Sequence, residues 1–360
     1  MSANSHPAAG LPIAITQGDA AGIGPETIAK AFRDAPEVLR GCFVAGDAAT
    51  LRRAAQAVSG PGCLPLPVAV LDSVADLAQV PPRCVALLQV VPLSTPPAYG
   101  QVSAAAGQAA AQCVRWAAQA ALRGELAALV TAPLHKAALA AAGEVFPGHT
   151  ELLQAEAAAF GGMRVADLPV RMMLANDELK TVLVSIHLPL REAIASLSQA
   201  SLLQTLQITH AALLGLLGRA PRIAVAGLNP HAGEGGLFGR EEIEHIAPAV
   251  AAARALGLDA HGPLAPDTVF MRARQRPGQA RGEFDVVVAM YHDQGLIPVK
   301  YLGVEQGVNV TLGLQGSTPR PWRLVRTSPD HGTAFDIAGS GRADAASLIA
   351  AVRLARQLAG

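Results

Sequence analysis

The sequence predicts an α/β fold in which mostly parallel sheets are flanked by helices. Short apolar runs alternate with longer alanine-rich stretches along most of the 360 residues, and this alternation is typical of parallel strands joined by helices. Hydrophobic residues make up 51% of the chain and charged residues only 16%, which is enough apolar material for two packed cores. We therefore expect two domains, between which the chain crosses more than once.

Strands are expected where an apolar run is bounded by turn-forming residues. After the first strand a helix opens at Pro25, another begins near Ala48, and a long helix covers Ser103 to Arg123 with Gly124 as its stop. The expected strands are 12–16, 42–46, 84–91, 127–133, 170–175, 181–186, 222–228, 284–290 and 308–313.

Composition argues against several classes of partner. The 28 Lys and Arg residues balance the 28 Asp and Glu residues, so the chain lacks the basic excess of nucleic-acid-binding proteins. The first ten residues contain no Lys or Arg and lead into no apolar signal core. Residues 193–218 are uncharged, but polar residues interrupt them and leucines recur at helical spacing, so we expect an amphipathic helix and not a membrane span. We expect a cytoplasmic protein with no nucleic-acid or membrane partner.

Three apolar runs end within a few residues of a histidine that stands beside turn-forming residues. His187 follows TVLVSI, His231 follows RIAVAGL and His292 follows FDVVVAM. The carboxyl ends of parallel strands meet at one edge of a sheet, where α/β proteins usually hold ligands, so these imidazoles are candidates for a divalent-metal site with an open position. Each could instead only hydrogen-bond to a loop carbonyl, because no HxxH spacing links them.

Two glycine-rich segments are candidate ligand loops. GDAAGIGPE (18–26) follows a strand and precedes a helix, so its amides are available to an anion, although it is not a GxGxxG fingerprint and could be a purely structural turn. SPDHGTAFDIAGSGRAD (328–344) has the polar and glycine density of a ligand loop, with a solvated turn as the alternative.

Taken together, GDAAGIGPE and DHGTAFDIAG resemble the isocitrate and isopropylmalate dehydrogenase superfamily, which binds NAD through a non-Rossmann fold. The motifs VTAPLHK, FPGHTE, IHLPLR, GLNPHAGEGG, AMYHDQG and VNVTLG resemble one family within it, the 4-hydroxythreonine-4-phosphate dehydrogenases, in the family's order over almost the entire chain. The resemblance implies a cofactor-binding domain formed by residues 1–132 with 314–360. Residues 133–313 would form a substrate, metal and dimerisation domain.

The resemblance also implies roles for single residues. The three histidines named above would bind one divalent metal, with ligands contributed across a homodimer interface. Lys300 and Asp267 are candidate catalytic proton carriers, and His149 and Thr150 are expected to donate hydrogen bonds to substrate. Without the resemblance, these side chains could be surface charges or helix caps. The candidate substrate-binding residues are His149, Thr150, Lys300, Asn309 and Arg326, and the candidate cofactor-binding residues are His331, Ala334, Asp336 and Asp344.

The implied reaction is the NAD-dependent and metal-dependent oxidation of 4-phosphohydroxy-L-threonine. Its 3-oxo acid product would decarboxylate to 3-amino-2-oxopropyl phosphate, a step of pyridoxal phosphate biosynthesis. Acidic residues near a ribose favour NAD over NADP, and the metal could be zinc, magnesium or cobalt. Related branches that act on threonate or erythronate phosphates, or on carboxylated cis-dihydrodiols, stay open as alternatives for the substrate.

Two readings from other classes also stay open. A metal-dependent hydrolase could use the same three histidines, but it would leave the DHGTAFDIAG loop without a role. A non-catalytic binding protein on the same fold would be marked by loss of a ligand histidine, and none is lost in this sequence.

One segment departs from the family pattern. Between TLGL and VRTS, where the family has a short apolar turn, this chain has QGSTPRPWRL (315–324). Because the insertion stands immediately before Arg326, Arg320 or Arg323 could reach the substrate in its place. Alternatively, the insertion could be a surface loop that changes nothing.

Overall fold

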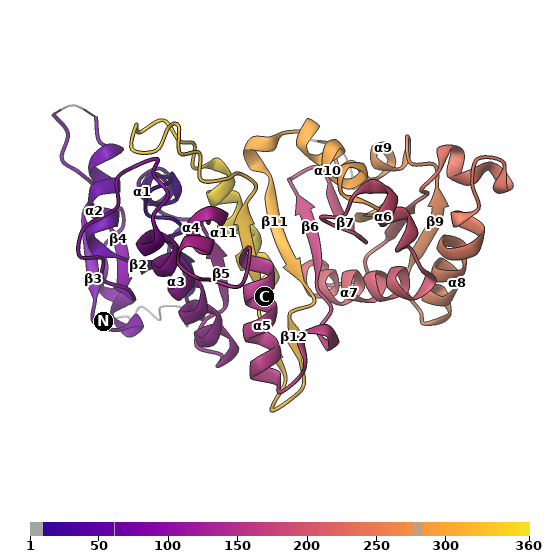
Figure 1. The fold of residues 1–360 in the computed structure, drawn as a ribbon, viewed down its shortest axis with the longest axis horizontal. Helices are drawn as coiled ribbons and strands as arrows, with labels where there is room; N and C mark the ends of the chain where they lie inside the picture. Colours follow the sequence, from indigo (N-terminus) through magenta and orange to yellow (C-terminus); the bar gives the residue numbers. More distant parts are fainter. Residues whose placement is uncertain (1–9, 61, 277, 279–281) are drawn as a thin grey trace, which may run out of the picture. The chain divides into compact units, whose positions relative to one another are not determined.

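The computed structural model describes residues 10–60, 62–276, 278 and 282–360 (Figure 1). Residues 1–9, on which the expectation about a signal segment largely rests, lie outside this range. The chain forms two compact units: unit 1 contains the residues up to Leu168 together with Leu314–Ala359, and unit 2 contains Pro169–Gly313. The chain therefore passes from one unit to the other twice.

Unit 1 has a parallel sheet with the strand order β3-β4-β2-β1-β5-β14. The helix α3 packs against β1, β2 and β5, and α11 packs against β5 and β14. Its strands are β1 (Ile13–Thr16), β2 (Cys42–Gly46), β3 (Val68–Leu71), β4 (Val85–Gln89), β5 (Ala128–Thr131) and β14 (Arg326–Pro329). Its helices are α1 (Gly24–Asp34), α2 (Ala48–Ala57), η1 (Val74–Gln79), α3 (Ala104–Leu122), α4 (Lys136–Ala141), α5 (His149–Gly161), η2 (Val165–Asp167) and α11 (Ala346–Ala359).

Local signals in the sequence explain where these helices begin and end. Pro25 occupies the first turn of α1, where its missing N–H costs nothing. The carboxylate of Asp47 accepts from the Thr50 amide and caps α2. Ser103 caps α3, and Gly124, with φ of 81°, follows its last turn as expected.

The first crossing between the units lies later than the sequence predicts. Residues 133–168 were assigned to the second domain by the resemblance, whereas they pack within unit 1. The reason is that α4 and α5 both pack against α3. Gly107 of α3 lies directly against the backbone of α4 at Ala138, and Arg115 of α3 forms an ion pair with Glu144 at 2.5 Å. The second crossing lies between Gly313 and Leu314.

The insertion at 315–324 is an ordered hairpin. Strands β12 (Gln315–Gly316) and β13 (Trp322–Arg323) pair antiparallel, and the Leu324 amide donates to the Leu314 carbonyl at 2.8 Å. Trp322 is buried, and its ring stands edge-on to Phe160 near the end of α5, with centroids 6.0 Å apart. Arg320 donates to the Arg123 carbonyl at the end of α3. The segment is therefore not a loose surface loop.

Unit 2 has a mixed sheet with the strand order β11-β6-β7-β10-β8-β9. The pairs β11/β6 and β6/β7 are antiparallel, and the pairs among β7, β10, β8 and β9 are parallel. Its strands are β6 (Arg171–Ala175), β7 (Lys180–Leu183), β8 (Ile223–Ala226), β9 (Ala260–Leu264), β10 (Val286–Ala289) and β11 (Val308–Leu312). Its helices are α6 (Leu190–Ala195), α7 (Gln199–Leu217), η3 (Pro230–Gly236), η4 (Glu242–Ile246), α8 (Ala247–Ala255), α9 (Val269–Ala273), α10 (His292–Tyr301) and η5 (Val304–Gln306).

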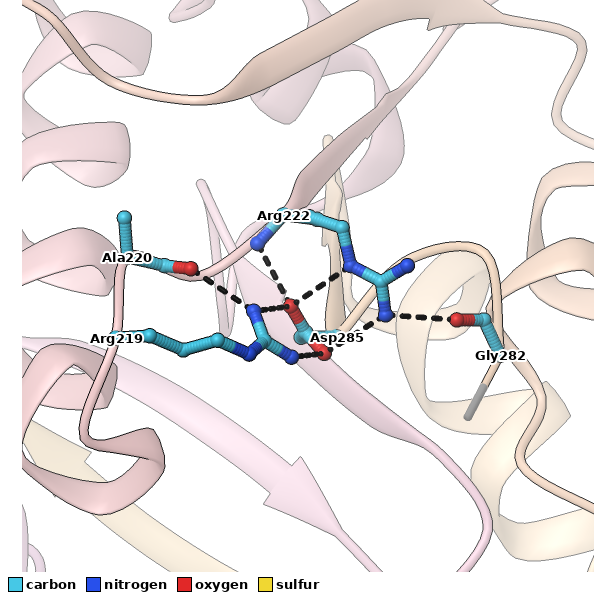
Figure 2. A network of polar contacts seen from close by, with 5 residues as sticks. All are labelled: Arg219, Ala220, Arg222, Gly282 and Asp285. Atoms are coloured by element: carbon cyan, nitrogen blue, oxygen red, sulfur yellow. Dashed lines mark hydrogen bonds and ion pairs between the residues drawn. The ribbon is translucent and has the colours of Figure 1, made fainter. Parts of the chain in front are cut away.

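A carboxylate joins the amino ends of β8 and β10. Figure 2 shows Asp285, which precedes β10, between the guanidinium groups of Arg219 and Arg222. The nearest contacts are 2.7 Å from Arg219 and 2.8 Å from the Arg222 amide. Burial alone would raise the pKa of Asp285, but the hydrogen bonds from both arginines hold it well below its ordinary value. The network thus fixes the starts of the two strands that lead to His231 and His292.

The uncharged stretch at 193–218 forms two helices and not one. The helix α6 ends at Ala195, and Ser198 then caps α7 by accepting from the Ser201 amide. By length and composition α7 could span a membrane, but one such helix is weak evidence. Its leucines Leu202, Leu206 and Leu213 are buried, and α7 packs against α8 and β7, as expected of an amphipathic core helix.

Candidate active site

A buried arginine stands beside the end of β5 in unit 1. Arg326 is 6% exposed, and its Nε and Nη2 atoms donate to the Thr131 hydroxyl at 3.0 and 2.8 Å. Burial lowers the pKa of Arg326 to about 10, and the charge of Glu151 acts in the opposite direction. The guanidinium therefore stays cationic at neutral pH. A buried cation of this kind is stabilised by an anionic ligand.

His149 lies close to this arginine, at the start of α5. Its ring hydrogen-bonds the Ala132 carbonyl, and its buried Nε2 atom has no hydrogen-bonding partner among the described residues. Burial, and then the charge of Arg326, hold the pKa of His149 well below its usual value, so the ring is neutral. Because a carbonyl only accepts, Nδ1 carries the proton and Nε2 is an acceptor. His149 is therefore an acceptor at Nε2 and not the donor that the family resemblance predicts.

We call Thr131, His149 and Arg326 the Arg326 cluster. Thr150 lies in the first turn of α5, whose N-cap is Gly148, so Thr150 is not the helix cap that the sequence allowed. The free amides of this turn add to the attraction of the cluster for an anion. Sequence reasoning missed Thr131, although its place at the end of a buried strand inside the VTAPLHK motif was a usable signal.

In unit 2 the structure brings two of the three predicted metal ligands together. His187 follows β7 and His292 begins α10 directly after β10, and their ring centroids are 5.9 Å apart. The Val184 amide donates to the Ala289 carbonyl at 2.9 Å and so continues the pairing of the two strands towards the histidines. Nδ1 of His292 contacts Asp293 at 2.7 Å, which orients the ring and leaves its other nitrogen for a ligand.

His231 stands apart from this pair in a loop with an unusual backbone. Residues 231–235 all have positive φ, including 52° at His231, a conformation that non-glycine residues adopt only when their surroundings enforce it. Glu242 holds the loop by accepting from the amides of Leu228 and Asn229 at 2.7 and 2.8 Å. Within the part of the chain that the structure describes, no group of three or more His, Cys, Asp or Glu side chains is arranged to hold a metal ion.

The remaining predicted residues of unit 2 lie on three elements. Lys300 is exposed in the last turn of α10, and Asn309 is half-buried in β11 opposite Leu174. Asp267 is exposed between β9 and α9, whose N-cap is Thr268. Asp267 is therefore not the helix cap that the sequence allowed.

The predicted cofactor loop follows β14 and is tied to α1. Glu26 accepts from the amides of Gly339 and Ala343 at 3.1 and 2.9 Å, and Lys30 donates to the Gly341 carbonyl at 2.6 Å. The first glycine-rich segment therefore has a structural role as the support of the second. The four predicted cofactor residues lie within this loop. Nδ1 of His331 contacts the Gly332 carbonyl, and Asp344 accepts from the Ala346 amide. Ala334 has a φ of 39°, and Asp336 is exposed.

Comparison with known proteins places this geometry in a family. The family profile described as "Pyridoxal phosphate biosynthetic protein PdxA" matches residues 39–355. A 4-hydroxythreonine-4-phosphate dehydrogenase of Beijerinckia indica is 49% identical over 96% of this chain and 95% of its own length. A D-threonate 4-phosphate dehydrogenase of Salmonella typhimurium is 44% identical over 96% of this chain and 98% of its own length.

Solved structures give the same result. The crystal structure of 4-hydroxythreonine-4-phosphate dehydrogenase from Klebsiella pneumoniae matches with a TM-score of 0.82 and 40% identity, covering 98% of this chain and all of that one. The agreement extends through both units, since hardly any part of either chain is left unmatched. The chain therefore belongs to the PdxA family of pyridoxal phosphate biosynthetic proteins.

Proposed function

We propose that this protein is an NAD-dependent dehydrogenase that oxidises 4-phosphohydroxy-L-threonine to a 3-oxo acid. This product then decarboxylates to 3-amino-2-oxopropyl phosphate, which is a step of pyridoxal phosphate biosynthesis in the cytoplasm. The observation that carries the proposal is the buried cation of Arg326, held next to a neutral His149 in a chain of this family. The cation fits a phosphate or carboxylate group of the substrate.

The other side chains have complementary tasks. Nε2 of His149 accepts a hydrogen bond from a hydroxyl or ammonium group, and the amides around Thr150 face an anion. Asn309 orients a polar substrate group. Lys300 and Asp267 move protons during oxidation and decarboxylation, because both are exposed titratable groups. The cofactor-binding domain, which the sequence predicts as residues 1–132 with 314–360, binds the cofactor through His331, Ala334, Asp336 and Asp344.

The three histidines fit a divalent metal by their donor type. Imidazole suits zinc and cobalt, and a site completed by substrate oxygens also admits magnesium. The contact from Asp293 to His292 is the usual second partner of a metal-binding imidazole. When bound, the metal supplies Lewis-acid stabilisation of negative charge on the substrate oxygen.

A homodimer would bring the third ligand to the site. Exposed apolar side chains follow each histidine along the chain, an arrangement typical of a surface that another protein covers. We propose that a second copy covers this surface and shares the metal site. The exposed apolar residues concerned are Leu188, Leu190 and Ile194 after His187, Leu237 and Phe238 after His231, and Ile297 and Tyr301 after His292.

Complementation between inactive variants tests the shared site. Alanine variants at His187, His231 and His292 should each be inactive alone. The variants are then co-expressed in pairs. Where the two chains of a dimer supply different ligands to each site, a hybrid dimer of two complementary variants has one site with all three histidines, so part of the activity returns. If no pair recovers activity, the site is not shared between two chains.

The substrate is tested by NADH formation in metal-supplemented protein. We expect turnover of 4-phosphohydroxy-L-threonine that a chelator abolishes. Replacing the buried cation in Arg326→Gln should raise the Michaelis constant roughly a hundredfold, because a charge-assisted contact to an anion is lost. Arg353→Gln removes the same charge from an exposed position on α11 and should leave the Michaelis constant unchanged. Equal Michaelis constants in the two variants would contradict the assignment of Arg326.

D-threonate 4-phosphate is the second candidate substrate, because a relative with 44% identity is named for it. It carries the same phosphate but a hydroxyl group where the first candidate has an ammonium group. Preference for this acid would keep the dehydrogenase chemistry and move the enzyme into a catabolic branch. An unphosphorylated dihydrodiol dicarboxylate tests the third branch in the same assay.

A further inference from the structure

A buried carboxylate in unit 1 has one oxygen without a partner. Asp19, in the turn after β1, is 0% exposed, and its Oδ1 atom accepts from the Ala21 amide at 2.8 Å. Its Oδ2 atom is also buried and has no hydrogen-bonding partner among the described residues. Leaving such an oxygen unsatisfied is costly, and native proteins rarely do so without a ligand or an ordered water.

A histidine beside this carboxylate also has a buried polar atom without a hydrogen-bonding partner among the described residues. His135 follows β5, and its ring stacks on Phe335 with centroids 4.4 Å apart and an interplanar angle of 14°. Its Nδ1 atom is buried and, within the described part of the chain, has no hydrogen-bonding partner. The two residues lie close together, since the charge of His135 acts on Asp19 and the Asp19 amide donates to the Pro133 carbonyl at 2.9 Å.

The position of this Asp19–His135 pair within unit 1 indicates which part of a ligand it would meet. On one side it adjoins the predicted cofactor loop, because Phe335 belongs to that loop and the Ile23 amide donates to the Thr333 carbonyl at 3.0 Å. On the other side it adjoins the Arg326 cluster through β5, which ends at Thr131. A hydride must pass from substrate to nicotinamide, so the nicotinamide half of the cofactor belongs between these two regions.

We propose that Asp19 and His135 form a subsite for the nicotinamide half of NAD, an inference that rests on the function proposed above. The group that fits has a donor and an acceptor side by side, as a carboxamide or the hydroxyl pair of a ribose does. Oδ2 of Asp19 accepts from this group, and Nδ1 of His135 completes the second hydrogen bond. The stacked ring of Phe335 holds the imidazole in place. Thr16 and Gln17, at the same strand end, each have a buried polar atom with no hydrogen-bonding partner among the described residues, and they extend the polar lining.

The test uses the full-length protein and measures binding of NADH, ADP-ribose and AMP by calorimetry. Asp19→Asn keeps the size of the side chain and loses the charge, and His135→Phe keeps the stack on Phe335 and loses the nitrogen. His210→Phe is the matched control, because His210 in α7 of unit 2 also has a buried Nδ1 atom without a hydrogen-bonding partner in the described structure. Each test variant should weaken NADH binding roughly tenfold, the effect of losing one hydrogen bond. The control should bind NADH like the wild type.

The ligand series identifies the group. AMP affinity should stay unchanged in both variants. Weaker ADP-ribose binding assigns the subsite to the ribose hydroxyls, and unchanged ADP-ribose binding with weaker NADH binding assigns it to the carboxamide. Wild-type affinity for NADH in both folded variants overturns the inference and leaves the proposed function standing. If the wild type itself does not bind NADH, the proposed function fails. If Asp19→Asn does not fold, His135→Phe decides alone.

Discussion

The Asp285 network allows a quantitative prediction for the substitution Asp285→Asn. The carboxylate of Asp285 is 8% exposed and accepts from Arg219 and Arg222, whose side chains are 33% exposed. Breaking a fully buried ion pair costs about 3–5 kcal/mol, and an exposed pair is worth about 0–1 kcal/mol. Because both guanidinium groups keep contact with water, we expect an intermediate loss of about 2–3 kcal/mol in the free energy of unfolding of unit 2.

The assay is differential scanning calorimetry of the full chain at neutral pH. A loss of this size corresponds to a decrease of roughly 5–10 °C in the Tm of unit 2. Glu283→Gln is the matched control, since Glu283 forms an exposed ion pair with Arg272 at 2.6 Å. The control should melt within about 2 °C of the wild type, as expected for a solvated pair. Identical Tm values for the two variants would refute the argument from burial.

The pH dependence gives a second check. The pKa of Asp285 is depressed in the folded state, so its stabilisation is present above the ordinary carboxyl pKa of about 3.9. It is lost as pH falls below that value towards the folded pKa. The difference in Tm between wild type and Asp285→Asn should therefore persist from pH 7 to about pH 5 and narrow below about pH 4.

Three further predictions concern unit 1. Trp322→Ala should loosen the hairpin that leads into Arg326 and so lower the Tm. It should also raise the Michaelis constant for a phosphorylated substrate more than it lowers kcat, and an unchanged Michaelis constant in steady-state kinetics would count against this. Burial raises the pKa of Cys42 and Cys113 to about 12, so a thiol reagent should label the exposed Cys63 first in the native protein. Equal labelling rates for the exposed and the buried thiols, measured by mass spectrometry, would contradict this prediction. Gly107→Ala should sharply lower the Tm, because a Cβ atom at this position meets the backbone of α4. The control Gly10→Ala places its Cβ atom in open space and should keep the wild-type Tm, and equal Tm values for the two variants would show that α3 and α4 can separate at little cost.

The strands that the sequence predicts best are those buried on both faces. The runs that form β1, β2, β5, β8 and β10 are continuous and apolar, so composition and length were enough to find them. The edge strands β3 and β9 were missed for different reasons. β3 is an apolar run of only four residues and is partly exposed, whereas a histidine, a glycine and a proline interrupt the apolar residues of β9. The antiparallel pairing of β6 follows from the chain path and leaves no mark on its own residues.

The residues of the candidate site likewise fall into those whose placement the sequence predicts and those whose placement depends on packing. His187 and His292 could be brought together by reasoning, because both follow parallel strands that prove to be neighbours. The position of His231 depends on a run of left-handed backbone that no sequence rule anticipates. Asp19 and His135 were not singled out because their significance lies in what their atoms fail to contact, and only packing reveals that. The acceptor state of His149 likewise depends on its bond to Ala132.

Unit 1 is made of two separate stretches of chain, and this has a consequence for the folding of the protein during translation. Unit 2 is one continuous stretch, so a nascent chain can complete it while unit 1 still lacks its last strand. Until β14 emerges from the ribosome, the edge of β5 has no partner on that side, and neither Arg326 nor the loop at 330–345 is available. The proposed substrate contact and the predicted cofactor loop are therefore both acquired only after the chain of unit 2 has been made. Until then, the open edge of β5 is the part of the growing chain most in need of protection from aggregation.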